Sequence, residues 1–243
     1  MTIPTLDYQP PADHAKPRRL QIAYLAPFAV FMLFTFAGGQ WPQFYPLSYV
    51  LKTFVVAVLL ICFWRYYSTI RWTHLWLGAL VGIVGVVQWI GIEKLFMHYD
   101  SLFRWTRISG DAKSVIEGAF RPLDHFESPL LAWSFIAVRL LGASLLVPVM
   151  EELFWRDYLW RSIASPNDFR LHQVGEYDPQ AFWFVPIAFA TVHPQWLTAI
   201  VWGLLIACLL VKTRSLGACI VAHGVTNLLL GLYVLKTGEW FFW

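Results

Sequence analysis

The amino-acid sequence predicts an all-α, polytopic membrane protein built as a bundle of about seven helices. Of the 243 residues, 58% are hydrophobic and only 14% are charged, and the mean hydropathy is +0.55. Soluble domains carry roughly 25% charged residues, so the composition excludes a water-soluble globule, and the apolar content also excludes a disordered chain. The net charge of +3 comes without a long basic block, so nucleic acid is not expected as a partner.

Seven apolar segments have the composition of membrane helices, each of which needs about 20 residues to cross the hydrocarbon core. They are residues 22–38, 47–64, 75–92, 130–152, 182–193, 197–212 and 216–235. The fifth segment is too short to span alone and is expected to lie among its neighbours or to be lengthened by its flanks. An eighth helix is predicted only if the polar interval after the third segment hides a re-entrant or interfacial helix. The chain therefore divides into a tail (1–20), three N-terminal helices (21–92), a polar interval (93–129), the later helices (130–236) and an aromatic end (237–243).

Basic residues near the helix ends predict which side of the membrane each end occupies. Lys16, Arg18 and Arg19 precede the first helix, and Arg65 and Arg71 follow the second, whereas the connection between these two helices carries no charge. Four further basic residues mark two later connections on the same side: Arg161, Arg170, Lys212 and Arg214. The N-terminus is therefore expected in the cytosol, and the aromatic C-terminal cluster is expected at the opposite membrane–water interface.

Two adjacent carboxylates, Glu151 and Glu152, lie at the end of the fourth apolar segment. Ionisable groups within membrane segments are costly and usually mark a functional site. On a regular helix Arg156 lies one turn after Glu152 and can pair with it, while Glu151 lies about 100° further round. The pattern predicts that Glu151 remains free for chemistry.

Polar residues also occur at three other places within the apolar segments: Arg139 in the fourth segment, His193 in the fifth, and His223 and Asn227 in the seventh. Counted at 1.5 Å per residue from the predicted cytosolic ends, the glutamates and both histidines lie at similar depths of about 13–18 Å. This agreement predicts one shared polar cavity that is open toward the cytosolic half of the bilayer. Arg139 is expected outside it, paired with a carboxylate or reaching a lipid headgroup.

A carboxylate, two imidazoles and a carboxamide suit amide hydrolysis. A carboxylate and an imidazole can deprotonate a water, and a second imidazole with a carboxamide N–H can stabilise the oxyanion. Glu151, His193 and His223 could instead bind one divalent metal such as zinc, although the sequence has no HExxH motif. A proton-coupled transporter is a further alternative, disfavoured because no internal repeat is visible.

Three motifs follow one another on the later helices: EExxxR at Glu151, Glu152 and Arg156, FxxxH at Phe189 and His193, and HxxxN at His223 and Asn227. In this order they resemble the motifs of the CAAX protease and bacteriocin-processing family of intramembrane endopeptidases, which includes the Ras-converting enzyme. The resemblance covers residues 146–232. The small size and the many tryptophans are also similar to a bacterial, exosortase-associated subgroup of CAAX prenyl protease-related proteins.

The resemblance implies a catalytic role for five residues. Glu151 and His193 would activate the attacking water, and His223 and Asn227 would form the oxyanion site. Glu152 belongs to the same set, held in place by an arginine. Whether a metal takes part is left open by the resemblance.

Arg156 and Phe189 are expected to support the site structurally. The resemblance also implies a membrane-associated protein or peptide substrate, cut near a membrane-embedded or lipidated end, and a location in a bacterial inner membrane. The alternative on the same scaffold is a non-catalytic membrane protein that serves in bacteriocin immunity or in partner binding.

Overall fold

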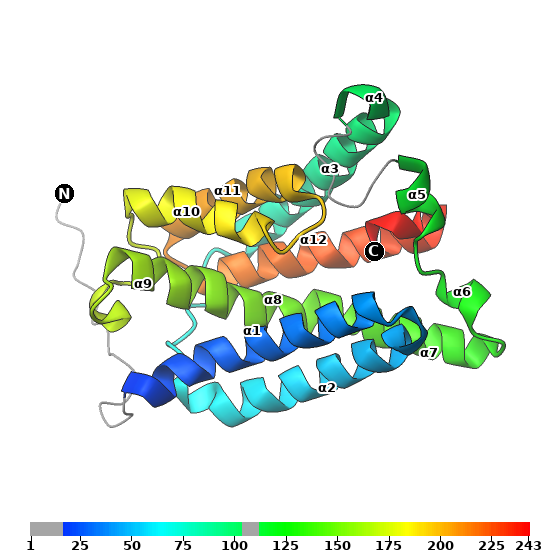
Figure 1. Ribbon diagram of the computed structural model, residues 1–243. Coiled ribbons are helices and arrows are strands. Elements are labelled where there is room, and N and C mark those ends of the chain that lie inside the picture. The colour runs from blue at the N-terminus through cyan, green and yellow to red at the C-terminus, as the bar shows by residue number, and fades with distance from the viewer. Residues whose placement is uncertain (1–16, 104–111) are drawn as a thin grey trace.

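The computed structural model describes residues 17–103 and 112–243. Within these ranges the chain is helical and contains no strand (Figure 1). Six helices are long and apolar enough to cross a membrane, and the fifth predicted segment forms a shorter apolar helix, α10 (Pro179–Ala190). The all-α polytopic bundle is therefore confirmed, with six helices of spanning length in the described ranges where the sequence predicts about seven.

The first half of the chain forms three long helices and several short ones. The long helices are α1 (Pro17–Gln40), α2 (Tyr45–Phe63) and α3 (Leu75–His98). The short elements are η1 (Pro42–Phe44), η2 (Trp64–Tyr66), α4 (Asp100–Phe103), α5 (Ala112–Glu117) and α6 (Pro122–His125). Helix α3 continues past the predicted boundary at residue 92, so the polar interval begins later than expected.

The described part of that interval contains no eighth spanning helix. Its central residues 104–111, which include Arg104 and Arg107, lie outside the described residues, as does the predicted tail up to Lys16.

The second half contains one long irregular helix, one helical hairpin and a final long helix. The irregular helix runs through α7 (Pro129–Leu141), η4 (Gly142–Leu146), α8 (Val147–Glu152), η5 (Leu153–Leu159) and α9 (Trp160–Ala164). Both η4 and η5 are π-helices, which are rare and occur frequently at functional sites. The turn η6 (Phe169–Leu171), the hairpin of α10 and α11 (Trp196–Thr213), α12 (Leu216–Thr237) and the turn η7 (Trp240–Phe242) follow.

Local capping determines where the later helices begin and end. The side chains of Asp178 and Ser215 accept hydrogen bonds from the backbone N–H groups of Ala181 and Ala218, at the starts of α10 and α12. Helix α12 ends at Gly238, whose φ of 72° is a conformation that glycine adopts without strain.

Helix α12 lies among several other elements and approaches α3 closely (Figure 1). The approach depends on two glycines one helical turn apart, Gly78 and Gly82. A Cβ atom at Gly78 would lie 2.4 Å from the Ala218 carbonyl oxygen, and one at Gly82 would lie 2.6 Å from the Ala222 carbonyl oxygen. Small residues at this spacing let two membrane helices pack backbone to backbone. Helix α12 also contacts α8 and α11, which brings together the helices that carry the predicted site.

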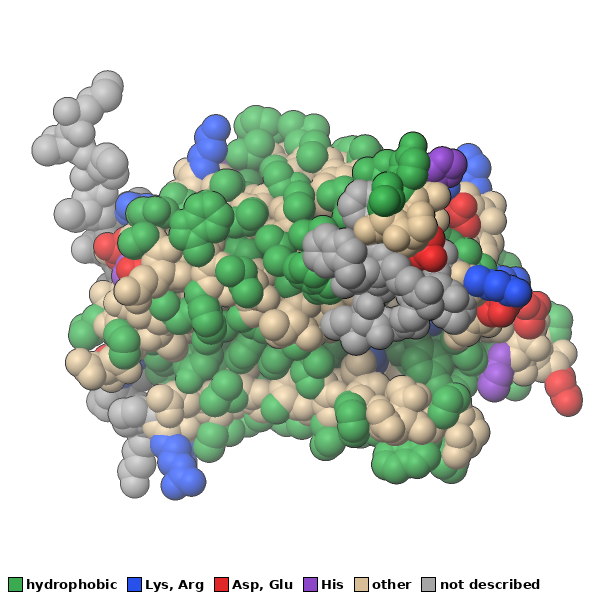
Figure 2. All heavy atoms as spheres, turned by 45° about the horizontal axis from the view of Figure 1, so that its top comes forward, with side chains coloured by type: hydrophobic (Ala, Val, Ile, Leu, Met, Phe, Trp, Pro, Cys, Tyr) green, Lys and Arg blue, Asp and Glu red, His purple; other side chains and the backbone are tan. Residues whose placement is uncertain are grey.

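The bundle has two distinct ends. We call the end at which α1, α10 and α12 begin the N-terminal end, and the opposite end, which carries α5, α6 and η7, the C-terminal end (Figure 1). Figure 2 shows hydrophobic side chains over the middle of the visible face and charged side chains mainly toward its two ends. Trp240 and Phe242 at the C-terminus are buried against the rest of the bundle.

Candidate active site

Four of the predicted catalytic residues line one cavity of about 290 Å³ inside the bundle. Glu151 projects from α8, His193 from the turn between α10 and α11, and His223 and Asn227 from α12. Glu151 is 5% exposed and His223 is 4% exposed, so the deepest part of the cavity is almost entirely shielded. The structure thus brings together groups that are separated by up to 76 positions in the chain, as Glu151 and Asn227 are.

Glu152 is the predicted catalytic residue that does not line this cavity. Its side chain is fully buried, and Oε1 accepts hydrogen bonds from Arg156 Nη1 at 3.2 Å and from His223 Nδ1 at 2.8 Å. The predicted pairing with Arg156 is therefore present. The second hydrogen bond gives Glu152 a positioning function, because it orients the imidazole of His223.

The bond to Glu152 also determines which nitrogen of His223 is available. An ionised carboxylate is an acceptor only, so Nδ1 carries the hydrogen and Nε2 is the free ring nitrogen. The ring of Trp202 packs edge-on against His223, with the ring centroids 4.6 Å apart. His223 is therefore held from two sides, by a carboxylate and by an aromatic ring.

His193 is oriented by the backbone of the helix that precedes it. Its Nδ1 lies 2.8 Å from the carbonyl oxygen of Phe189, and since a carbonyl can only accept, Nδ1 is the donor and Nε2 is free. Helix α10 ends at Ala190. Pro194, the residue after His193, has no backbone N–H to continue the helix. The short helix thereby leaves His193 inside the bundle.

Asn227 is fixed by the first π-helix. Its Nδ2 atom donates to the carbonyl oxygen of Ala143 in η4, at 2.8 Å. This bond uses one of the two hydrogens of the carboxamide nitrogen, so the second remains available to a group in the cavity.

Glu151 differs from Glu152 in where its carboxylate lies. In both residues the Oε2 atom is buried and has no hydrogen-bond partner among the described residues, but only Glu151 lines the cavity. Buried polar atoms are normally paired, so an unpaired carboxylate oxygen on a cavity wall indicates a place where a water or a substrate atom binds.

Residues 132–229 match the family model described as Type II CAAX prenyl endopeptidase Rce1-like. The match covers less than half of the chain, and this part of the chain is similar to that family. The matched range contains all of the motif residues, from Glu151 to Asn227. No curated protein and no solved structure matches the chain. The Rce1-like family is a family of peptidases, and the similarity to it together with the six apolar helices indicates an integral membrane protein.

Two further motif residues, Arg156 and Phe189, lie beside the site. Arg156 is 1% exposed, and its guanidinium lies 4.9 Å from the ring centre of Phe189 and 5.4 Å from that of Trp202. A desolvated cation over two aromatic rings is stabilised by their π-faces. Phe189 also packs against the ring of His193, with the centroids 4.2 Å apart.

The metal site that the sequence leaves open does not fit this arrangement. Among the described residues, no group of three or more His, Cys, Asp or Glu side chains is placed to hold a metal ion. This applies to the candidate set of Glu151, His193 and His223. No step of the chemistry proposed below therefore passes through a metal.

Several residues that line the cavity beside the motif residues were not predicted from the sequence. Trp202 packs between Phe189 and His223, and Tyr49, Phe242 and Trp243 are among the other residues of the wall. Aromatic residues within apolar segments do not stand out in a sequence so rich in them, and so no local signal marks these four.

Arg139 adopts neither of the expected arrangements. It is 5% exposed, and the described residues contain no ion pair of its guanidinium, which lies over the rings of Tyr45, Tyr49 and Trp243 at 5.7, 5.5 and 4.7 Å. Stacking on aromatic rings stabilises the cation within the bundle.

Proposed function

We propose that the protein is an intramembrane endopeptidase that hydrolyses a peptide bond near the membrane-embedded or lipidated end of a membrane-associated protein or peptide. One observation carries this proposal. Glu151, with its unpaired carboxylate oxygen, lines the same buried cavity as His193, His223 and Asn227, within the segment that matches the Rce1-like family.

In the proposed reaction Glu151 is the general base. Its carboxylate removes one proton from a water molecule, and the free Nε2 of His193 accepts a hydrogen bond from the other. The water oxygen then bonds to the carbonyl carbon of the scissile peptide. The proton held by Glu151 passes to the amide nitrogen as the C–N bond breaks, which yields one new carboxyl group and one new amine.

The oxyanion of the tetrahedral intermediate needs hydrogen-bond donors in place before the reaction. Asn227 supplies the carboxamide hydrogen that Ala143 does not use. His223 donates through Nε2 only when both of its ring nitrogens carry a proton, because Nδ1 already donates to Glu152. The buried carboxylate of Glu152 stabilises this imidazolium, much as the aspartate of a serine-protease triad stabilises its histidine.

We further propose a bacterial inner-membrane location with the N-terminus in the cytosol. The support is the excess of basic residues at the N-terminal end of the bundle, where Arg18, Arg19, Arg65 and Arg71 lie at or beside the ends of α1, α2 and α3.

The test compares protein termini in membranes of cells that express the wild-type chain, Glu151→Gln or Glu127→Gln at equal levels. Glu127 is exposed and lies away from the cavity, so it offers the same chemical change as a matched control. We expect new termini with the wild type and Glu127→Gln, and their loss with Glu151→Gln, since the amide cannot take the proton from water. Undiminished termini with folded Glu151→Gln protein would exclude Glu151 as the base.

A further inference from the structure

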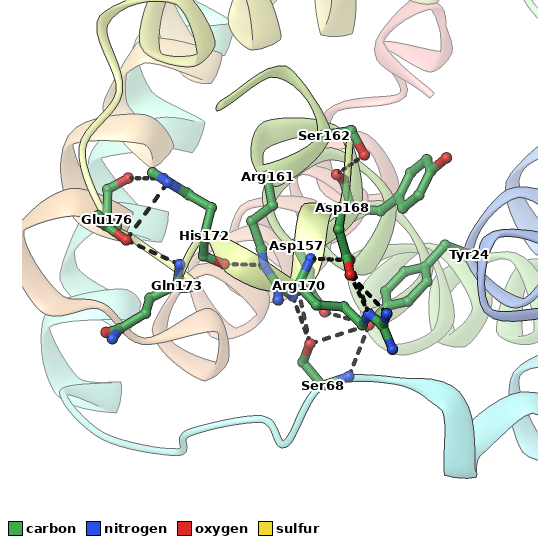
Figure 3. Close-up of polar contacts among 11 residues, drawn as sticks. Tyr24, Ser68, Asp157, Arg161, Ser162, Asp168, Arg170, His172, Gln173 and Glu176 are labelled. Atoms are coloured by element: carbon green, nitrogen blue, oxygen red, sulfur yellow. Dashed lines mark hydrogen bonds and ion pairs between the residues drawn. The ribbon is translucent and has the colours of Figure 1, made fainter. Parts of the chain in front are cut away.

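The N-terminal end of the bundle is closed by a buried polar network (Figure 3). Asp157 is at its centre: Oδ2 accepts from the hydroxyl of Tyr24 at 2.8 Å, and Oδ1 accepts from the hydroxyl of Ser68 at 3.1 Å. Arg161 pairs with Asp157, donates to Ser68 Oγ at 2.8 Å and donates through Nε to the His172 carbonyl at 2.6 Å. Both members of the ion pair are 0% exposed. The network therefore ties α1, α9, η5 and two connecting segments together.

Further contacts close the same end around this network. Trp160 is 0% exposed, and its indole N–H donates to the Glu176 carbonyl at 3.0 Å. The buried hydroxyl of Ser215 lies 2.7 Å and 2.8 Å from the carbonyl oxygens of Arg71 and Thr73. Opening a route at this end would leave a buried ion pair and several polar groups without partners, which is strongly unfavourable.

The catalytic cavity extends in the opposite direction. Its floor is formed by the buried side chains of Glu151 and His223, whereas His193 and Gln195 are partly exposed and Thr35 on α1 is exposed. Exposure thus increases from the catalytic carboxylate toward the later part of α1 and the turn that joins α10 to α11. The shortness of α10 produces this arrangement, because its turn lies within the bundle and leaves room toward the C-terminal end.

A second, wider cleft of about 820 Å³ adjoins the cavity at the C-terminal end. The two share Gln195 and Trp243, and the cleft is also lined by Gly39 at the end of α1 and by the charged side chains of Arg121 and Asp124. The walls are largely apolar but include polar groups, which suits an extended peptide whose backbone groups need hydrogen-bond partners.

We propose that substrates reach the catalytic cavity from the C-terminal end of the bundle, opposite the side on which α1 begins. With a cytosolic N-terminus, this mouth faces the non-cytosolic side, and the substrate class is a membrane-associated protein whose scissile bond lies on that side. That a substrate enters here rests on the proposed function, whereas the position of the cavity opening does not depend on it. This direction is opposite to the one predicted from the residue depths alone, which placed the opening toward the cytosolic half of the bilayer.

The test uses single cysteines in the full-length protein. The native cysteines are first replaced by Cys62→Ser, Cys208→Ser and Cys219→Ala, since two of them are exposed and the third is buried among apolar atoms. This background must retain the wild-type cleavage found by comparing protein termini.

Three probe positions are then introduced one at a time. Gln195→Cys lies at the boundary of cavity and cleft, Gly39→Cys lies in the cleft, and Asn167→Cys is exposed at the N-terminal end. A Cβ atom at Gly39 meets nothing within 4 Å, so this variant is expected to fold normally even if Gln195→Cys does not. The reagent is a charged methanethiosulfonate that does not cross membranes, applied to spheroplasts and to inside-out vesicles.

We expect the reagent to modify Gln195→Cys and Gly39→Cys in spheroplasts and Asn167→Cys in inside-out vesicles. Modified Gln195→Cys should lose cleavage completely, whereas modified Asn167→Cys should keep it. Modification of Gln195→Cys from the same side as Asn167→Cys would overturn the proposal. If the wild type cuts nothing, the proposed function fails while the labelling sides still decide where the cavity opens.

Discussion

Replacing Arg156 by methionine tests whether the Glu152 carboxylate depends on its buried partner. The two side chains are 1% and 0% exposed and 3.2 Å apart, so neither charge is solvated by water. Methionine keeps much of the length of arginine and can pack against Phe189 and Trp202. The change therefore removes the cation with little loss of volume, and it leaves the buried Glu152 carboxyl with His223 as its remaining hydrogen-bond donor.

The expected cost follows from the burial of the pair. Removing one partner of a buried ion pair destabilises a protein by about 3–5 kcal/mol, because the other charge is left without compensation. We therefore expect Arg156→Met to lower the free energy of unfolding by about 3 kcal/mol or more, which is over a hundredfold in the unfolding equilibrium.

The assay is reversible unfolding of the purified protein in detergent, for the wild type, Arg156→Met, Glu152→Gln and the double variant. The double variant should be more stable than Arg156→Met, since glutamine carries no charge that needs compensation and its carbonyl can still accept from His223. A loss below about 1 kcal/mol in Arg156→Met, or costs that simply add in the double variant, would refute this account of the site.

Two further predictions concern packing and pH. Gly78→Ala should lower the free energy of unfolding by about 1–3 kcal/mol, because its Cβ would meet the Ala218 carbonyl. Gly39→Ala should leave the stability nearly unchanged, and equal stability of the two variants would contradict the α3–α12 contact. Hydrogen bonds from Arg170 hold the pKa of Asp168 below its usual value, so its stabilisation is present at neutral pH and is lost as the pH falls below about 4. Because the pair is partly exposed, Asp168→Asn should cost less than about 1 kcal/mol in denaturant unfolding at pH 7, and a cost that persists at pH 2 would contradict the assignment.

The helices were largely predictable because their signal is local. An apolar run of sufficient length is helical in a membrane whatever surrounds it, since the bilayer offers no other partner for the backbone. The boundaries were less predictable, as the polar residues Glu93 and Lys94 show: both lie within α3, although their charge suggested a loop. Glu93 is tolerated there because Thr198 on α11 donates a hydrogen bond to it, a contact that links distant parts of the chain.

The roles within the site were only partly predictable. The spacing of Glu152 and Arg156 predicted their pairing correctly, because partners one helical turn apart meet on the same helix face. That Glu152 also binds His223 could not be predicted, since the two lie on different helices. The Ala143 carbonyl that holds Asn227 depends in the same way on where α7 and its π-helix lie beside α12.

The sequence by itself determined that this chain lies in a membrane, where most of its helices lie and which polar residues are candidates for its chemistry. These properties follow from composition and from spacing along single helices, where the physics is local. Only the tertiary structure decided that Glu152 is hydrogen-bonded to His223, that aromatic residues line the cavity, and that Glu151, His193, His223 and Asn227 share it. Each of these depends on how helices distant in sequence pack side by side, and the free energy of that packing is shared among many contacts that no short motif encodes.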